Sequence, residues 1–169
     1  MAVGPGEIAH QHDPSLLDNG NILLFDNGAH RQDGSCVSYS RVIEVNPTTN
    51  KIEWEYKANP PQSLYSALIS GCQRLPNGNT LICEGLKGRV FEITMDGEIV
   101  WEYRSPFYAL HAAQQAKVLK HPSIIWRHSN ALFRAYRHMP NLPGFKGREL
   151  SPEKLDWVNR LYGQEAFEN

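Results

Sequence analysis

The chain carries one strand pattern twice, and this repeat restricts the fold more than any other feature of the sequence. Three segments of the first copy recur in the second: LLDNGNILLF (16–25), SRVIEV (40–45) and KIEWEY (51–56) return as RLPNGNTLIC (74–83), GRVFEI (88–93) and EIVWEY (98–103). Such a repeat is one supersecondary unit, which buries its faces by stacking on copies of itself. The differences between the copies are therefore the best guide to function.

Each copy contains the pattern of four short strands. In the first copy, the strands at 12–17 and 21–25 are joined by Asn19-Gly20, and Asn77-Gly78 makes the same connection in the second copy. Asn-Gly is typical of a two-residue type I′ hairpin, because both central residues of that turn need a positive φ. The third and fourth strands follow with alternating apolar and polar residues. Each copy is therefore predicted to be an antiparallel meander.

These meanders predict a mainly all-β domain at residues 8–104. It would contain two four-stranded antiparallel blades of the β-propeller type, at 8–58 and 69–104. Propellers usually need about four or more blades to close a ring. The sequence leaves three possibilities for a chain with two: a fragment, a truncated gene product, or a half that completes itself by association.

The repeat stops after Tyr103, and residues 105–169 are expected to form a partly helical extension that packs on the blades. Ser105-Pro106 predicts a helix that ends before His121-Pro122, and Ser151-Pro152-Glu153 predicts the start of a last helix. The run NALFRAYRH (130–138) has the pattern of a strand. No catalytic spacing is visible in this extension.

Composition argues against several classes of partner. The 169 residues include 17 basic and 18 acidic side chains, which gives a net charge of -1. This balance creates no electrostatic field that would attract nucleic acid or anionic lipid. No apolar run approaches the roughly 20 residues of a membrane-spanning helix. The N-terminal segment lacks the basic and apolar regions of a signal peptide. We therefore expect no nucleic-acid or membrane partner, and the compartment stays open.

Three cysteines, Cys36, Cys72 and Cys83, lack the CxxC spacing of a metal site, so no metal or other cofactor is expected. A strict two-residue hairpin at Asn77-Gly78 would place Cys72 opposite Cys83. The pair would then be hydrogen-bonded, with side-chain directions that disfavour a disulfide. We expect two free thiols.

The first copy contains an insertion. Asn19 and Asn77 lie 58 positions apart, whereas Arg41 and Arg89 lie 48 apart, so the first copy holds ten additional residues between its second and third strands. These residues lie within DNGAHRQDGSCVSYS (26–40).

Strand direction places this insertion beside His12. In an antiparallel meander, the start of the first strand, the end of the second and the start of the third share one edge. Asn27 and His30 of the insertion and Arg41 should therefore lie near His12, as candidate substrate contacts. The first strand of a blade commonly lines the channel of a propeller, so His12 is expected near a channel mouth, where small ligands bind.

Comparison of the copies separates scaffold from site. Ser70 stands where the first copy has His12, and Cys83-Glu84-Gly85-Leu86 stands where it has Phe25-Asp26-Asn27-Gly28. Arg41 recurs as Arg89, which favours a structural role. Other readings stay open: His12 could be a hydrogen-bonded surface histidine, Asn27 a loop-shaping residue, and His30 a solvated loop residue.

The string HQHDPSLLDNGNILLFDNGAHR (10–31), with YSRVIEV, WEY, NALFRAYRH and PGFKGREL, resembles the arylsulfotransferase family. The resemblance extends from about residue 9 to residue 150, and QHD with FDNG is its most specific part. It implies a six-bladed propeller, an extracytoplasmic location, and transfer of a sulfuryl group from an aryl sulfate to a phenol through a sulfohistidine. His12 would be the catalytic nucleophile, with His10 as the nearest competitor. Neutral imidazole suits this role near pH 7.

The resemblance also implies that other blades supply histidines, an arginine and an asparagine to the transferring group. Such groups often provide the largest catalytic effect, so this chain alone is expected to lack most of the active site. The alternative function is a non-catalytic propeller fragment that serves as a binding or assembly module. Open blade edges would then favour self-association. A quinone-dependent dehydrogenase is disfavoured, because no carboxylate-rich calcium site is present.

Overall fold

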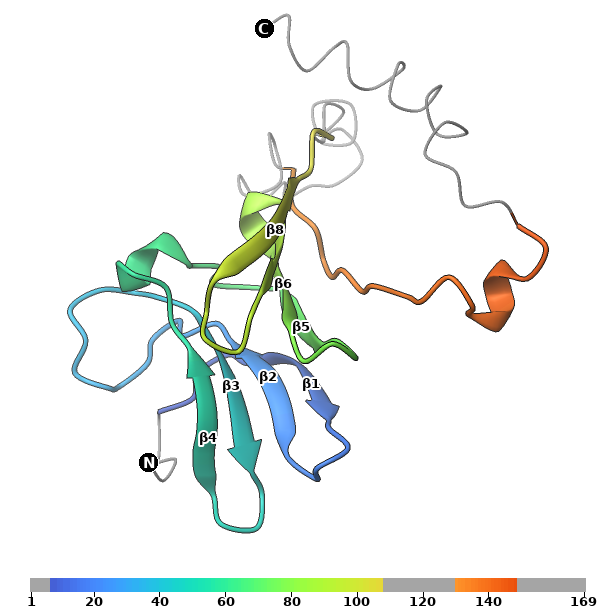
Figure 1. Ribbon diagram of the computed structural model, residues 1–169. Helices are drawn as coiled ribbons and strands as arrows, with labels where there is room; N and C mark the ends of the chain where they lie inside the picture. Colours follow the sequence, from blue (N-terminus) through green and yellow to red (C-terminus); the bar gives the residue numbers. More distant parts are fainter. Residues whose placement is uncertain (1–6, 108–129, 149–169) are drawn as a thin grey trace, which may run out of the picture. The chain divides into compact units, whose positions relative to one another are not determined.

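The computed structural model describes residues 7–107 and 130–148 (Figure 1). The chain divides into two compact units. One comprises Met1–Arg104 with Ala131–Tyr136, and the other comprises Ser105–Asn130 with Arg137–Asn169. The strands described below all belong to the first unit. The helices expected within 105–120 and from residue 151 onward fall mainly on residues outside the described ranges.

The first copy of the repeat forms a four-stranded antiparallel sheet in the order β1-β2-β3-β4. Its strands are β1 (His12–Leu16), β2 (Ile22–Asp26), β3 (Arg41–Asn46) and β4 (Lys51–Tyr56). A short 3₁₀ helix, η1 (Pro61–Ser63), lies in the connection to the second sheet. The predicted meander is confirmed. The two central strands, β2 and β3, are almost wholly buried, and only β4 alternates between half-buried and exposed residues.

The second copy forms a sheet of the same kind in the order β5-β6-β7-β8. Its strands are β5 (Gly71–Arg74), β6 (Thr80–Glu84), β7 (Arg89–Ile93) and β8 (Ile99–Arg104), with the 3₁₀ helix η2 (Gly85–Lys87) between β6 and β7. Fourteen residues, 27–40, join β2 to β3, whereas four, 85–88, join β6 to β7. The insertion of ten residues in the first copy is therefore confirmed.

The Asn-Gly turns differ from the type I′ prediction. Gly20 and Gly78 have φ values of 84° and 86°, but neither preceding asparagine has a positive φ. Leu75 N donates to Asn79 O at 2.8 Å, and Gly78 N donates to Leu75 O at 2.9 Å. This geometry is a three-residue loop, a type I turn closed by a glycine bulge. The type I′ prediction was wrong, since Asn-Gly suits both loops and the flanking pairing selects one.

The longer loop shifts the strand register by one residue. Cys72 pairs with Ile82, and Cys83 pairs with Gly71. The two cysteines therefore point to opposite faces of the sheet, in contrast to the predicted pairing. Both are buried free thiols. Burial raises the pKa of Cys83 to about 12 and that of Cys72 further still, so neither is a reactive thiolate at neutral pH.

One core is shared by the two sheets. β5 lies against β1 and β2, and buried side chains from both sheets form a single cluster: Leu23, Phe25, Val42, Leu64, Cys72, Ile82, Phe91 and Ile93. A second cluster covers the other face of the second sheet, where Leu132 and Ala135 pack on it. In the described part of the chain, the two sheets do not close into a ring.

The run at 130–138 forms no strand, which corrects the sequence prediction. It contributes two isolated backbone hydrogen bonds: Leu132 N donates to Gly85 O at 2.9 Å, and Phe133 O accepts from Ser70 N at 3.2 Å. Because its partners lie in two different turns, no ladder can extend along it. The 3₁₀ helix η4 (Pro143–Phe145) belongs to the other unit.

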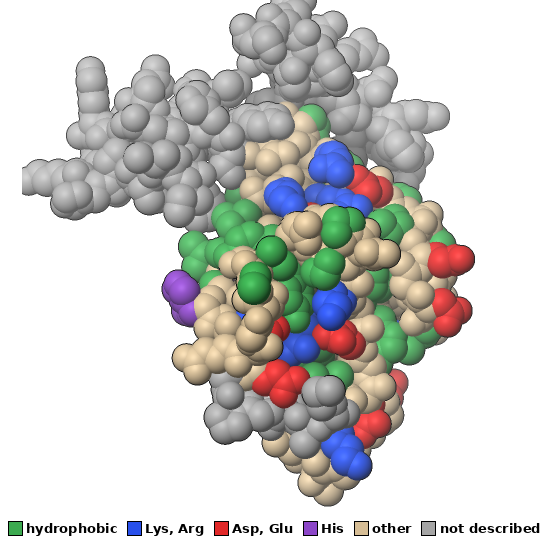
Figure 2. All heavy atoms as spheres, turned by 90° about the vertical axis from the view of Figure 1, so that its left-hand side faces the viewer, with side chains coloured by type: hydrophobic (Ala, Val, Ile, Leu, Met, Phe, Trp, Pro, Cys, Tyr) green, Lys and Arg blue, Asp and Glu red, His purple; other side chains and the backbone are tan. Residues whose placement is uncertain are grey.

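Charges of both signs are mixed on the surface. In the face shown in Figure 2, basic and acidic side chains lie next to one another rather than in patches of one sign. Among the described residues, no helix is long and apolar enough to cross a membrane.

Candidate active site around His12

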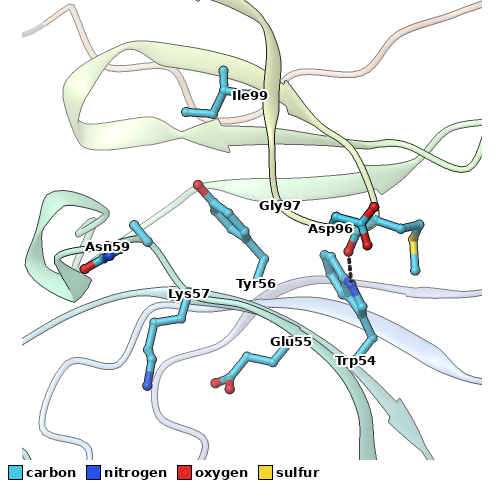
Figure 3. A pocket seen from close by; sticks show the side chains of 10 residues that line it. Trp54, Glu55, Tyr56, Lys57, Asn59, Asp96, Gly97 and Ile99 are labelled. Atoms are coloured by element: carbon cyan, nitrogen blue, oxygen red, sulfur yellow. Dashed lines mark hydrogen bonds between the residues drawn. The ribbon is translucent and has the colours of Figure 1, made fainter.

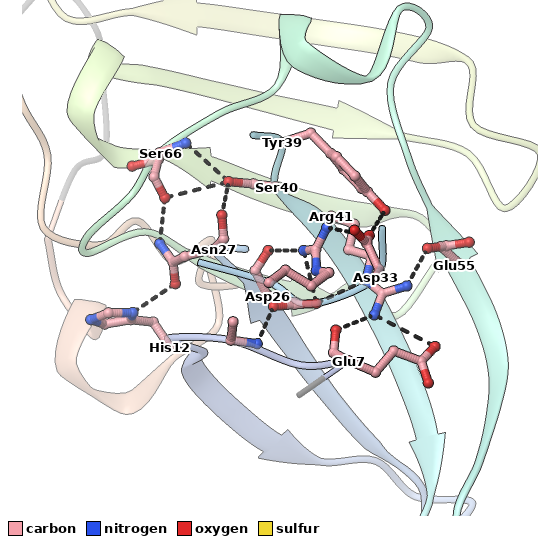
Figure 4. A network of polar contacts seen from close by, with 12 residues as sticks. Glu7, His12, Asp26, Asn27, Asp33, Tyr39, Ser40, Arg41, Glu55 and Ser66 are labelled. Carbon is pink, nitrogen blue, oxygen red and sulfur yellow. Dashed lines mark hydrogen bonds and ion pairs between the residues drawn. The ribbon is translucent and has the colours of Figure 1, made fainter. Parts of the chain in front are cut away.

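His12 opens β1 at the edge where the insertion begins. Its backbone pairs with Phe25, and its side chain is half-buried. The ring nitrogen Nδ1 lies 2.7 Å from Asn27 Oδ1 and 2.9 Å from the carbonyl oxygen of His10. Figure 4 shows one ring nitrogen, Nδ1, directed at Asn27 and the other directed away from it.

These contacts define the tautomer of the His12 ring. Both partners of Nδ1 are oxygens that only accept, so Nδ1 must carry a proton and donate. In the neutral imidazole, Nε2 then holds the lone pair. The site therefore presents Nε2 as a nucleophile or base.

Asn27 orients this ring from a fully buried position. Its Nδ2 donates to the carbonyl oxygens of Ser66 at 2.6 Å and Ile69 at 2.9 Å, which leaves Oδ1 to face His12. Its own carbonyl oxygen accepts from Ser40 Oγ at 2.8 Å. The sequence suggested substrate contact for Asn27; in the structure its amide joins His12 to the connection between the sheets.

The second sheet shows what the scaffold uses at the same place. Ser70 and Gly85 are the counterparts of His12 and Asn27, and there Gly85 N donates to Ser70 Oγ at 2.9 Å. The second sheet thus has a hydrogen bond between a serine side chain and the backbone at the place where the first sheet has a histidine and an asparagine. The pair His12–Asn27 is specific to the first sheet.

The insertion brings a second histidine to this edge. His30 is exposed, and its ring meets that of His10 edge to face, with 5.5 Å between centroids. The side chain of Arg31, the next residue, is buried and donates to Asp26 Oδ2 at 3.0 Å, while its guanidinium lies over the Tyr39 ring at 4.3 Å. The loop therefore folds back on the sheet around Arg31 and leaves His30 at the surface.

Arg41 lies in a buried ion-pair network. Its Nε donates to Asp26 Oδ2 at 2.8 Å and its Nη1 to Glu55 Oε1 at 2.8 Å. Burial alone would lower the pKa of Arg41, but the hydrogen bonds to Asp26 and Glu55 outweigh it and raise the pKa. Figure 4 shows Asp26, Arg41 and Glu55 to the right of His12 and Asn27.

The same network recurs in the second sheet. Arg89 lies 3.6 Å from Glu84 and 2.7 Å from Glu102, the counterparts of Asp26 and Glu55. Because the arrangement is common to both sheets, it supports a structural role for Arg41.

An open hollow lies at another place in the first unit, away from these residues. This open groove of about 490 Å³ is formed by β4 and the turn between β7 and β8, where Trp54 Nε1 donates to Met95 O at 3.0 Å (Figure 3). None of His12, Asn27, His30 and Arg41 lines it. The described residues contain no group of three or more histidine, cysteine or acidic side chains that could hold a metal ion.

The family model and these observations together define the class of protein. Two stacked antiparallel sheets repeat one scaffold, and only the first carries an oriented imidazole. The chain belongs to the arylsulfotransferase (ASST) family, whose family model matches residues 4–106. This confirms the resemblance found in the sequence, and the match includes both sheets and His12. Comparison with curated proteins and with solved structures gave no match.

Sequence reasoning missed the groups that hold Asn27. Ser66 and Ile69 act through their backbone carbonyls, which leave no signal in residue type. Ser40 was visible only as the last residue of the insertion. The positive φ values of Ile69 and Ser70 are also unusual for these residue types and could not be anticipated from them.

Proposed function

We propose that this protein transfers a sulfuryl group from an aryl sulfate to a phenol, with His12 as the nucleophile. Family membership supports an arylsulfotransferase-like function and these two classes of substrate. The observation that carries the proposal is the hydrogen bond between His12 Nδ1 and Asn27 Oδ1, because it leaves Nε2 as the nucleophilic nitrogen.

The proposed reaction has two displacements. In the first, Nε2 attacks the sulfur of the aryl sulfate, an N–S bond forms, and the S–O bond to the ring breaks with departure of a phenolate. In the second, the oxygen of the acceptor phenol attacks the same sulfur, the N–S bond breaks and returns its electron pair to Nε2, and the phenolic proton passes to the phenolate released in the first step or to water. Asn27 and His10 accept from Nδ1 in both steps and keep the ring in place.

The proposal assigns different roles to the other candidate residues. His30 is exposed at the edge that carries His12, so it is available to a bound anion. Asn27 and Arg41 have their polar groups engaged in buried contacts, which supports positioning. Direct substrate contact by Asn27, His30 and Arg41 stays a prediction.

We further take the two sheets as neighbouring blades of a six-bladed propeller. Their identical strand order, the contact of β1 with β5 and the shared core support this interpretation. In such a ring, other blades would add donors for the sulfuryl oxygens. Self-association through the edge strands also stays a prediction.

The test is a labelling experiment on the full chain. We expect incubation with p-nitrophenyl sulfate to release nitrophenolate and to add one sulfuryl group to the peptide that contains His12. A phenol added afterwards should remove the label. His12→Asn should abolish the label, and His138→Asn serves as the matched histidine control, since this exposed residue of the other unit should leave His12 labelled.

Two results would contradict the proposal. One is label on His10 or His30 in the wild type with none on His12. The other is complete absence of label under conditions in which an active family member is labelled, which would favour a binding or assembly role.

A further inference from the structure

Residues Ala131–Tyr136, here named the strap, extend from the second sheet to Asp13 of β1, although they are more than one hundred residues away from it in sequence. Leu132 and Ala135 pack on the outer face of the second sheet. The backbone of Leu132 and Phe133 is tied to Gly85 and Ser70. The strap is thus anchored on the second sheet.

The C-terminal end of the strap reaches the first sheet at Asp13. Arg134 Nη1 lies 3.0 Å from Asp13 Oδ1, and the Tyr136 hydroxyl donates to the same oxygen. The hydrogen bond to Asp13, followed by burial, raises the pKa of Tyr136, so the phenol keeps its proton and remains a donor at neutral pH. Arg134 and Tyr136 therefore act on Asp13 as a two-donor clamp.

Asp13 needs such a clamp, because its backbone is strained. It directly follows His12, has a φ of 56°, and lies where the pairing of β1 with β2 shifts between His12 and Ser15. A left-handed conformation costs a non-glycine residue roughly 1 kcal/mol. An irregularity of this kind re-aims the neighbouring side chains.

The second sheet leaves room for this carboxylate. Gly71, the first residue of β5, faces Asp13, and a Cβ atom at that position would overlap the carboxylate. Asp13 is 6% exposed, and its Oδ2 has no hydrogen-bond partner among the described residues. The aspartate is therefore enclosed by β5 on one side and the strap on the other.

We propose that the strap positions His12 for reaction, through the clamp of Arg134 and Tyr136 on Asp13. The imidazole is then held from two sides: Asn27 sets its ring through Nδ1, and the clamp sets the backbone from which it projects. Arg134 also neutralises a carboxylate next to the nucleophile, which reduces repulsion of an anionic aryl sulfate. The benefit to catalysis rests on the proposed function, whereas the contacts of the clamp do not depend on it.

The test uses Tyr136→Phe and Arg134→Gln in the full chain. The first readout is the nitrogen NMR signals of the His12 ring without any donor, in which we expect both variants to shift the Nδ1 and Nε2 signals. The second is the rate of sulfuryl labelling of His12, which should fall roughly tenfold or more through misplacement of the nucleophile. Arg134→Lys keeps the charge and should retain more of the rate than Arg134→Gln.

Matched controls come from β8, where Tyr103 and Arg104 are exposed. Tyr103→Phe and Arg104→Gln should leave the His12 ring signals and the labelling rate at wild-type values. Unchanged ring signals in both clamp variants would overturn the inference, even if their unfolding temperatures fall. Absence of label in the wild type would refute the proposed function alone, because the ring signals still report on the clamp.

Discussion

At the level of single residues, the site depends on a buried amide and a buried guanidinium group that form hydrogen bonds with the groups around them. Asn27 has no exposed surface and satisfies two carbonyl groups and one imidazole. Arg41 satisfies Asp26 and Glu55. Their loss would leave buried polar groups without partners, which costs more than the hydrogen bonds contribute.

Asn27→Ala should therefore destabilise the protein strongly. Loss of the amide removes the shortest donor from the Ser66 carbonyl, leaves the Ile69 carbonyl unpaired and takes one of two acceptors from His12 Nδ1, so we expect the free energy of unfolding to fall by about 3 kcal/mol. Urea denaturation measures this change. Gln32→Ala, at an exposed position of the same loop, should stay within about 0.5 kcal/mol of the wild type. Equal effects of the two substitutions would contradict the assigned role of Asn27.

Arg41→Met and Arg89→Met form a matched pair across the repeat. Each removes one of the two cations that contact a fully buried carboxylate, Asp26 or Glu84, and we expect a loss of about 2 kcal/mol in each case. The losses should be similar, because Arg31 still neutralises Asp26 and Lys87 still neutralises Glu84. Denaturation curves that match the wild type for Arg41→Met would show that this network does not stabilise the sheet.

At the level of secondary-structure elements, an ion pair joins the two sheets away from the site. Glu44 of β3 accepts from Asn19 and Asn21 of the adjacent turn and from Arg74 of β5, at 2.9, 2.8 and 2.9 Å. Burial alone would raise the pKa of Glu44, but the hydrogen bonds from Asn21 and Asn19 and the charge of Arg74 outweigh it and lower the pKa. The carboxylate form thus stabilises the contact between sheets.

The sign of this pKa shift predicts an acid-sensitive contact. A lowered pKa in the folded state stabilises the protein above the unfolded value of about 4.3, and the contribution disappears as the pH falls through the folded value. Glu44→Gln should reduce the unfolding free energy at pH 7 by about 1–2 kcal/mol. The difference from the wild type should shrink below about pH 4.

Denaturation at several pH values checks this prediction. Glu53→Gln, at an exposed position of β4, is the control and should track the wild type throughout. A difference for Glu44→Gln that stays constant from pH 7 to the acid range would mean that the carboxylate charge is not responsible.

For the first unit as a whole, the shared core predicts that the two sheets unfold together. Phe25 of the first sheet and Phe91 of the second are both fully buried in one cluster. Neither sheet can retain this core without the other.

Phe91→Ala should consequently weaken both sheets by about 3–5 kcal/mol. Amide hydrogen exchange in β2 and β6 reports on the two sheets separately, and their opening free energies should fall together. The side chain of Ile99 is 49% exposed. Ile99→Ala should therefore change the opening free energy of either sheet by less than about 1 kcal/mol. Faster exchange confined to β6 would show that the sheets are independent.

Several features of the fold and the site could be predicted from local patterns. The alternating residues predicted eight strands and their antiparallel order, and subtraction of the two copies located the insertion and singled out His12 against Ser70. The inferences on the strands and on the insertion succeeded because strand periodicity and repeat offsets are local properties of a chain, whereas the role of His12 stays a prediction. The loop type at Asn77-Gly78 failed at the same level, since both candidate loops accept those residues.

The repeat in the sequence established the scaffold and drew attention to His12, which the second copy replaces with a serine. Only the tertiary structure decided how that position is held. Asn27 meets the Ile69 carbonyl across 42 residues, and Asp13 meets Tyr136 across 123. No pattern in the sequence links such partners, because a buried polar group is satisfied by whichever group the packed chain brings within hydrogen-bonding distance. Local periodicity builds the sheets, and long-range satisfaction of buried polar groups orients the histidine.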